Sequence, residues 1–151
     1  MLAEVLAAVA VVAIGFAALT SALPVAGAAV GEGARLSTAA FLACARLEEI
    51  RAAAWSAVPP ADRLGVSGGH LSPPQSGGMT TFPDEAALPD PFASYSRQVR
   101  VLDCAMPPGC GAVTSSGLRQ VTVTVAYRPA TAGGLAGLDK TVSVSTLVAQ
   151  R

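Results

Sequence analysis

The sequence predicts an α+β protein in which one long N-terminal α-helix packs on a small antiparallel β-sheet. Three observations predict this class. Residues 5–31 are uncharged and mostly apolar, residues 35–55 have helical periodicity without proline or glycine, and the last third alternates between polar and apolar side chains. With 13% charged residues and a net charge of +0, the chain lacks the basic surface of a nucleic-acid binder and is too apolar for disorder.

The N-terminal run is long enough to cross a membrane. Residues 5–31 contain no Lys, Arg, Asp, Glu or His over 27 positions. At about 1.5 Å per residue a helix of this length reaches about 40 Å, more than the roughly 30 Å of hydrocarbon in a bilayer. Because proline and glycine are tolerated in membrane helices, we expect the helix to continue through Pro24 with a bend there.

Three interpretations of this run compete. A cleavable secretory signal is favoured by the small residues Ala26, Gly27 and Ala28, but the residues before the run carry an acid, Glu4, and no positive charge. A plain transmembrane anchor would take its orientation from flanking basic residues, the first of which is Arg35. The third interpretation must explain Glu4, since a carboxylate at the start of an apolar helix usually has a partner.

Residues 1–6 (Met-Leu-Ala-Glu-Val-Leu), followed by Ala-Ala-Val-Ala-Val-Val-Ala-Ile-Gly, resemble the N-terminus of mature type IV pilins and type II secretion pseudopilins. The resemblance implies that a prepilin peptidase exposes and methylates the N-terminus, here Met1. It also implies that the Glu4 carboxylate pairs with the terminal amine of a neighbouring subunit. Family members carry this glutamate as the fifth residue, so either one residue precedes Met1 in the mature chain or the register is shorter by one.

The resemblance implies a set of partners and a location. The partners are other copies or related pilin subunits, prepilin peptidase, an inner-membrane assembly platform and, before assembly, membrane lipid. The subunit would be a single-pass protein of the bacterial inner membrane and then part of a periplasmic or extracellular filament. The start of the chain, the short apolar sheet and the ending Thr-Val-Ser-Val-Ser-Thr-Leu-Val-Ala favour a minor subunit, which primes or tips the filament, over a major one.

Four segments follow from the composition. Residues 1–33 form the membrane or filament-core helix, and residues 34–57 continue it along the head. Residues 58–94 form a connecting loop rich in proline and glycine, with room for one short strand or helix, and residues 95–151 form the sheet. Pro59 and Pro60 end the helix because proline cannot donate the backbone hydrogen bond.

The second helical segment has one apolar stripe that we expect to face the sheet. It consists of Leu36, Ala40, Ala43 or Cys44, Leu47, Ile50 and Ala54. Gly31 and Gly33 separate this segment from the apolar run, so the helix is either continuous or partly melted there.

Residues 96–102, 118–127 and 141–149 alternate in the manner of half-buried strands. The simplest topology for them is an antiparallel meander packed on the helix stripe. Cys104 and Cys110 lie in the loop between the first two strands, and in an exported head we expect them to form a disulfide. Cys44 is expected to be a small buried residue of the helix stripe.

Catalysis and metal binding find little support in the sequence. His70 is the only histidine, and no nucleophile or acid stands at motif spacing from it, so we expect a solvated loop residue. No Cys-x-x-Cys spacing indicates zinc, and the acids Asp84, Glu85 and Asp90 match no compact calcium loop. We therefore expect no metal, no cofactor and no enzyme activity.

Charge is divided unevenly along the head. Residues 57–94 carry four acids and one base, whereas residues 95–151 carry two acids and six bases. Opposite charges on the connector and the sheet either help one subunit dock on the next or attract the two parts of one head.

The sequence thus predicts a structural subunit of a type IV pilus or pseudopilus-like filament, assembled through its N-terminal helix. The main alternative is a secreted or membrane-anchored β-rich binding domain. The two differ at the N-terminus, because a filament subunit keeps the apolar helix and a secreted domain is cut near Ala28.

Overall fold

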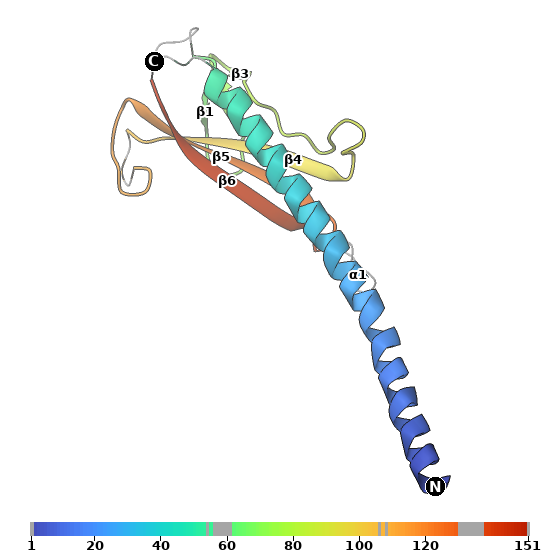
Figure 1. Ribbon diagram of the computed structural model, residues 1–151. Coiled ribbons are helices and arrows are strands. Elements are labelled where there is room, and N and C mark those ends of the chain that lie inside the picture. Colours follow the sequence, from blue (N-terminus) through green and yellow to red (C-terminus); the bar gives the residue numbers. More distant parts are fainter. Residues whose placement is uncertain are drawn as a thin grey trace.

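The computed structural model confirms the α+β class. The chain forms one long helix followed by two three-stranded antiparallel sheets (Figure 1). The structure describes residues 2–53, 55, 62–105, 107, 109–129 and 138–150. Met1, whose processing and methylation the sequence predicts, and the pair Pro59-Pro60, which is expected to end the helix, lie outside these residues.

The small sheet has the strand order β1-β2-β3 and the larger sheet the order β4-β5-β6. The elements are α1 (Leu2–Ala52), β1 (Val66–Ser67), β2 (Pro74–Ser76), β3 (Met79–Thr80), β4 (Tyr95–Asp103), β5 (Leu118–Tyr127) and β6 (Lys140–Ala149). The larger sheet is the predicted antiparallel meander, with each strand at or within one residue of its expected bounds.

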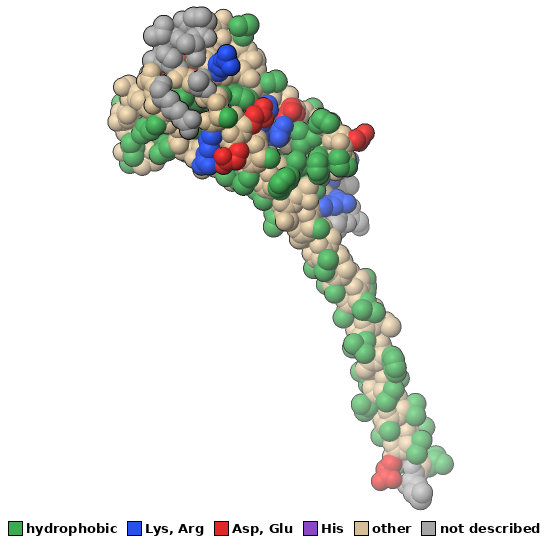
Figure 2. Space-filling model, turned by 45° about the horizontal axis from the view of Figure 1, so that its top comes forward, with side chains coloured by type: hydrophobic (Ala, Val, Ile, Leu, Met, Phe, Trp, Pro, Cys, Tyr) green, Lys and Arg blue, Asp and Glu red, His purple; other side chains and the backbone are tan. Residues whose placement is uncertain are grey.

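The helix α1 is unbroken over 51 residues and contains Pro24, Gly31 and Gly33. Its N-terminal half projects away from the head, and its C-terminal half lies along the larger sheet (Figures 1 and 2). The glycines near the head therefore do not melt the helix. The predicted segments 1–33 and 34–57 share one continuous helix as far as Ala52.

The face of α1 that packs on the sheet differs in part from the predicted stripe. The buried residues are Ala39, Leu42, Ala43, Leu47 and Ile50. The expectation for Cys44 is wrong, because its side chain is exposed, and Leu36 is 50% exposed. Successive helical residues differ by about 100°, so with Ala43 facing the sheet the next residue turns to the helix flank. Ala54 lies outside the described residues.

The larger sheet has one apolar and one polar face. Val121, Val123 and Val125 of β5 are fully buried beneath α1. On the opposite face, the hydroxyls of Thr122 and Thr124 hydrogen-bond those of Ser145 and Ser143 in β6, at 2.8 and 2.9 Å. This alternation explains why periodicity alone located the strands.

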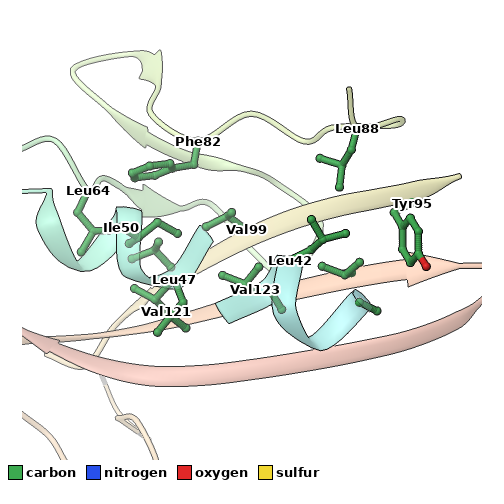
Figure 3. Packing of buried hydrophobic residues seen from close by; sticks show 14 of the residues in the cluster. Leu42, Leu47, Ile50, Leu64, Phe82, Leu88, Tyr95, Val99, Val121 and Val123 are labelled. Carbon is green, nitrogen blue, oxygen red and sulfur yellow. The ribbon is translucent and has the colours of Figure 1, made fainter. Parts of the chain in front are cut away.

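The connector also contributes side chains to this core. Leu64, Phe82 and Leu88 are buried against residues of α1 and the larger sheet (Figure 3). The segment contains three short strands rather than the single short element expected. Strands of two or three residues carry too little alternation for a sequence signal. Gly77 and Gly78, both at positive φ, form the tight turn between β2 and β3.

The predicted disulfide between Cys104 and Cys110 is confirmed. It closes the loop between β4 and β5, where both cysteines are buried. Gly109 has φ +75°, and a Cβ at this position would collide with the carbonyl of Val113. The loop therefore needs glycine next to its second cysteine.

Two leucines of α1 allow a matched test of the core. Leu47 is 4% exposed in the head, and Leu23 is 71% exposed in the projecting half of the helix. Leu47→Ala is expected to lower the free energy of unfolding of the head by about 2–5 kcal/mol through lost burial and a residual cavity. Leu23→Ala is expected to leave it unchanged. Urea unfolding in detergent micelles, followed by the fluorescence of Trp55, measures both; equal losses would contradict this packing.

Candidate functional site

The most extensive exposed apolar surface described is the projecting half of α1. Its large hydrophobic side chains are all more than half exposed, from Leu2 at 80% to Val30 at 74%. By length and composition this helix is able to cross a membrane. Figure 2 shows apolar side chains along this part of the helix, with an acidic group only near its end. Exposure of an apolar surface of this extent to water is unfavourable.

The predicted subunit-pairing carboxylate, Glu4, lies in the first turn of α1. From Leu2 to Gly31 it is the only ionisable side chain in the sequence. The helix dipole favours an anion at this end. The structure therefore presents one carboxylate at the tip of an apolar rod.

Pro24 lies inside the projecting half. It has no amide hydrogen, so the carbonyl four residues earlier, that of Thr20, lacks its usual helical donor. The Thr20 hydroxyl itself donates to the carbonyls of Phe16 and Ala17, at 3.1 and 3.0 Å. Helix continues on both sides of Pro24, and the bend there stays a prediction.

A polar cluster fixes the place where α1 leaves the head. Glu32 accepts hydrogen bonds from the Tyr127 hydroxyl at 2.9 Å and from Lys140 Nζ at 2.7 Å. Arg35 Nη1 donates to the carbonyl of Arg128 at 2.6 Å. Burial, followed by the hydrogen bond to Glu32, raises the pKa of Tyr127, so its phenol stays protonated as a donor. One turn of α1 is thereby tied to the ends of β5 and β6.

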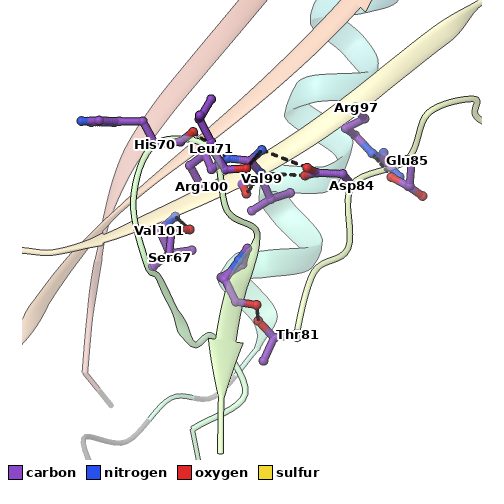
Figure 4. Close-up of polar contacts among 11 residues, drawn as sticks. Ser67, His70, Leu71, Thr81, Asp84, Glu85, Arg97, Val99, Arg100 and Val101 are labelled. Atoms are coloured by element: carbon purple, nitrogen blue, oxygen red, sulfur yellow. Dashed lines mark hydrogen bonds and ion pairs between the residues drawn. The ribbon is translucent and has the colours of Figure 1, made fainter. Parts of the chain in front are cut away.

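Two arginines of β4 hold the connector. Arg100 makes a bidentate ion pair with Asp84, at 2.6 and 2.9 Å, and Arg97 pairs with Glu85 at 2.6 Å (Figure 4). Arg100 also donates to the carbonyls of His70 and Leu71. These contacts show that acids of the connector attract bases of the sheet within one head, which is one of the two roles left open for the uneven charge.

A third pair is buried at the far end of the head. Arg119 Nη1 lies 2.7 Å from Asp62 Oδ1, and both side chains are less than 10% exposed. The same oxygen accepts the amides of Leu64 and Gly65. The guanidinium also stacks 4.2 Å from the ring centroid of Trp55. This cluster joins the connector, β5 and Trp55, which lies three positions after the end of α1.

Burial raises the pKa of the Asp62 carboxyl, but hydrogen bonds from Arg119, Gly65 and Leu64 outweigh it. The net pKa lies below the ordinary value. The folded state therefore favours the ionised form of Asp62.

The described residues contain no group of three or more His, Cys, Asp or Glu side chains that could hold a metal ion. The His70 side chain is exposed, as expected, and beside it lies a depression of about 330 Å³ that includes Gln120 and Thr122. Arg100, at the same depression, is already paired with Asp84.

The sequence did not predict the cluster around Arg119 or the cluster around Glu32. Asp62 and Arg119 are 57 positions apart, and Glu32 is 95 positions from Tyr127, so no local pattern links them. One signal was present, because Arg119 is in phase with the buried valines of β5. A charge on the buried face of a strand requires a partner inside the head.

Searches against protein-family models, curated protein sequences and solved structures find no match for this chain.

Replacing Asp62 tests the buried pair. Asp62→Asn leaves the Arg119 guanidinium buried without its counter-charge, and we expect a loss of about 3–5 kcal/mol in the free energy of unfolding. Asp139→Asn is the control, because Asp139 is 61% exposed and lies 3.9 Å from Arg128. Its effect should stay within about 1 kcal/mol. A small effect of Asp62→Asn in urea unfolding would contradict the role assigned to this pair.

The lowered pKa of Asp62 predicts an acid-sensitive head. The stabilisation is fully present above the unfolded pKa of about 3.8 and is lost as the pH falls through the lower folded value. Unfolding curves at a series of pH values from 7 down to about 2 should show this loss in the native chain. In Asp62→Asn this component should be absent, and an identical pH dependence of the two proteins would contradict the assignment.

Proposed function

We propose that this chain is a structural subunit of a type IV pilus or pseudopilus-like filament, assembled through its N-terminal helix. The observation that carries the proposal is the exposed apolar rod from Leu2 to Val30, with Glu4 in its first turn and a small head at its other end. The resemblance of residues 1–6 and the following apolar run to the pilin N-terminus supports the same conclusion.

The apolar rod explains how the subunit would move from the membrane into a filament. In the membrane, lipid surrounds the apolar side chains of α1; in a filament, helices of other subunits replace the lipid. The many alanines and glycines of the rod allow such helices to approach closely. In these apolar surroundings a cation stabilises the Glu4 carboxylate, and in the filament this cation is the terminal ammonium of a neighbour. This pairing sets the register between subunits.

The proposal includes a location and partners. The subunit is inserted as a single-pass protein of the bacterial inner membrane and is extracted into a periplasmic or extracellular filament. Prepilin peptidase, the assembly platform and other pilin subunits act on it or pack with it. The short three-stranded sheet β4-β5-β6 and the alternating end of the chain favour a minor subunit that primes or tips the filament. No enzyme activity is part of this function.

A secreted or membrane-anchored β-rich binding domain is the second candidate. The small residues Ala26, Gly27 and Ala28 favour it, because they suit cleavage by a signal peptidase. A signal sequence near the N-terminus is also long and apolar enough to resemble a membrane span. The two candidates predict different N-termini.

Mass spectrometry of the intact chain and its N-terminal peptide, from native membranes, separates them. The filament proposal predicts a methylated N-terminus at Met1 or one residue before it, with the apolar helix retained. A chain that begins after Ala28 would overturn the proposal in favour of the secreted domain.

Glu4→Gln tests the pairing carboxylate. It removes the charge with little change in side-chain size, so membrane insertion should persist while incorporation into sheared filaments falls at least about tenfold, corresponding to the loss of one buried ion pair. Glu49→Gln is the matched control, because Glu49 lies on the exposed side of α1 beside the head. Immunoblots of membrane and filament fractions measure both, and equal incorporation of the two variants would contradict the role of Glu4.

A further inference from the structure

The two edge strands of the larger sheet, β4 and β6, differ in what covers them. The connector covers β4, where Glu85 and Arg97 exchange backbone hydrogen bonds and the Leu88 amide donates to the Tyr95 carbonyl. At the other edge, β6 pairs with β5 and with no other described strand (Figure 1). Among the described residues, the connector thus covers the β4 edge, and no strand pairs with the β6 edge.

The backbone groups at the open edge are identifiable. The Gln150 amide donates to the Gly117 carbonyl, so even-numbered residues of β6 bond β5 and odd-numbered ones point outward. Ala149 agrees with this alternation, because its carbonyl accepts from Trp55 Nε1 at 3.1 Å. The other outward residues have no backbone hydrogen bond to any described residue. They are Thr141, Ser143, Ser145 and Leu147.

The edge lacks the features by which proteins usually block strand addition. The strand β6 contains no proline or glycine over ten residues, and its one charge, Lys140, stands at its start. Natural edges carry charged side chains, prolines or bulges, or are short. A long uncharged edge is suited to pairing with another extended chain.

The flank of α1 provides an apolar wall beside this edge. Arg51 Nη2 donates to the Thr146 hydroxyl of β6, so this side of the helix overlooks β6. Cys44 and Ala40 stand seven and eleven residues earlier, within about 20° of Arg51 around the helix. Cys44 is exposed and Ala40 half-buried, and Val142 of β6, also half-buried, packs against the core. An added strand would bury apolar side chains against this wall.

A symmetric pair of copies does not fit the edge. If β6 of one copy paired antiparallel with β6 of another, a two-fold axis perpendicular to the sheet would relate the two copies. Any direction that lies in the plane of the sheet in one copy would then be reversed in the other. Because α1 lies along the sheet (Figure 1), the two helices would leave in opposite directions and could not enter the same membrane. Among the described strands, β5 is internal, β4 is covered and β1–β3 have two or three residues each. Within the part of the chain that the structure describes, a second copy thus offers no strand for a symmetric pair.

We infer that β6 accepts an extended strand from a different protein chain, which completes the sheet beneath the flank of α1. Its recognition chemistry is an uncharged segment with alternating apolar and small polar side chains, matching the valines on one face of β6 and the hydroxyls on the other. This inference goes beyond filament assembly and requires only that α1 is anchored in a membrane.

Accessibility of Cys44 provides the first measurement. A membrane-impermeant maleimide reagent should label Cys44 more slowly in native membranes than after extraction into detergent, because the added strand covers the flank. The critical variants are Ser145→Pro and Ser145→Ala. Both lose the hydroxyl contact with Thr122, but only proline removes an outward amide, and it breaks no bond to β5.

The expected effects differ between these variants. Loss of one main-chain donor weakens strand binding by about fivefold, so Ser145→Pro should label up to about fivefold faster than Ser145→Ala, which should stay as protected as the native chain. Urea unfolding checks that both heads are folded. If Ser145→Pro does not fold, Ser143→Lys places a blocking charge on the same edge, with Gln98→Lys of β4 as its control.

Crosslinking identifies the occupant. A bifunctional maleimide reagent attached to Cys44 should yield, by intact mass, a conjugate with a different chain, and the yield should fall in the proline variant. Equal labelling of the native chain in membranes and detergent would overturn the inference. Protection that survives edge blocking, or a conjugate with the mass of two copies, would also overturn it. None of these outcomes depends on methylation at Met1, which tests the proposed function separately.

Discussion

The buried contact between Arg119 and Asp62 is the interaction on which the head depends. The guanidinium lies on the otherwise apolar face of β5 and is neutralised by a carboxylate from the connector. Through the ring of Trp55 the same group also reaches the residues that follow α1. Three segments distant in sequence therefore meet at one charge. Its burial is tolerable only when all three are in place, which makes docking of the connector part of folding rather than a later addition.

The polar contacts of the head divide into two functions. Those at the far end, around Arg119, and those along β4 hold the connector to the sheet. Those around Glu32 hold the helix at its exit from the head, where Tyr127 and Lys140 converge on one carboxylate. The apolar core between these groups supplies most of the stabilisation, and the polar contacts fix which packing is adopted.

Periodicity predicted the parts of the fold that have regular patterns. The uncharged run, the helix and the three alternating segments have clear periods, and their elements were located to within a few residues. The side assigned to Cys44 was wrong because α1 is apolar around most of its circumference, and neighbouring positions then compete for the buried face. The pairing of Asp62 with Arg119 was not predictable because it depends on the folded path of the connector. Of the candidate site, the sequence indicated the apolar rod, Glu4 and the disulfide.

The unbroken course of α1 has a mechanical consequence. With 51 residues at about 1.5 Å each, the helix is a lever of about 75 Å with the head clamped along one end. Because Glu32 and Arg35 tie the helix to the head at its exit, a force on the head passes into the backbone hydrogen bonds of the rod. Pro24 interrupts those bonds, so tension on the rod concentrates there. The rod is thus stiff next to the head and most compliant within its apolar half.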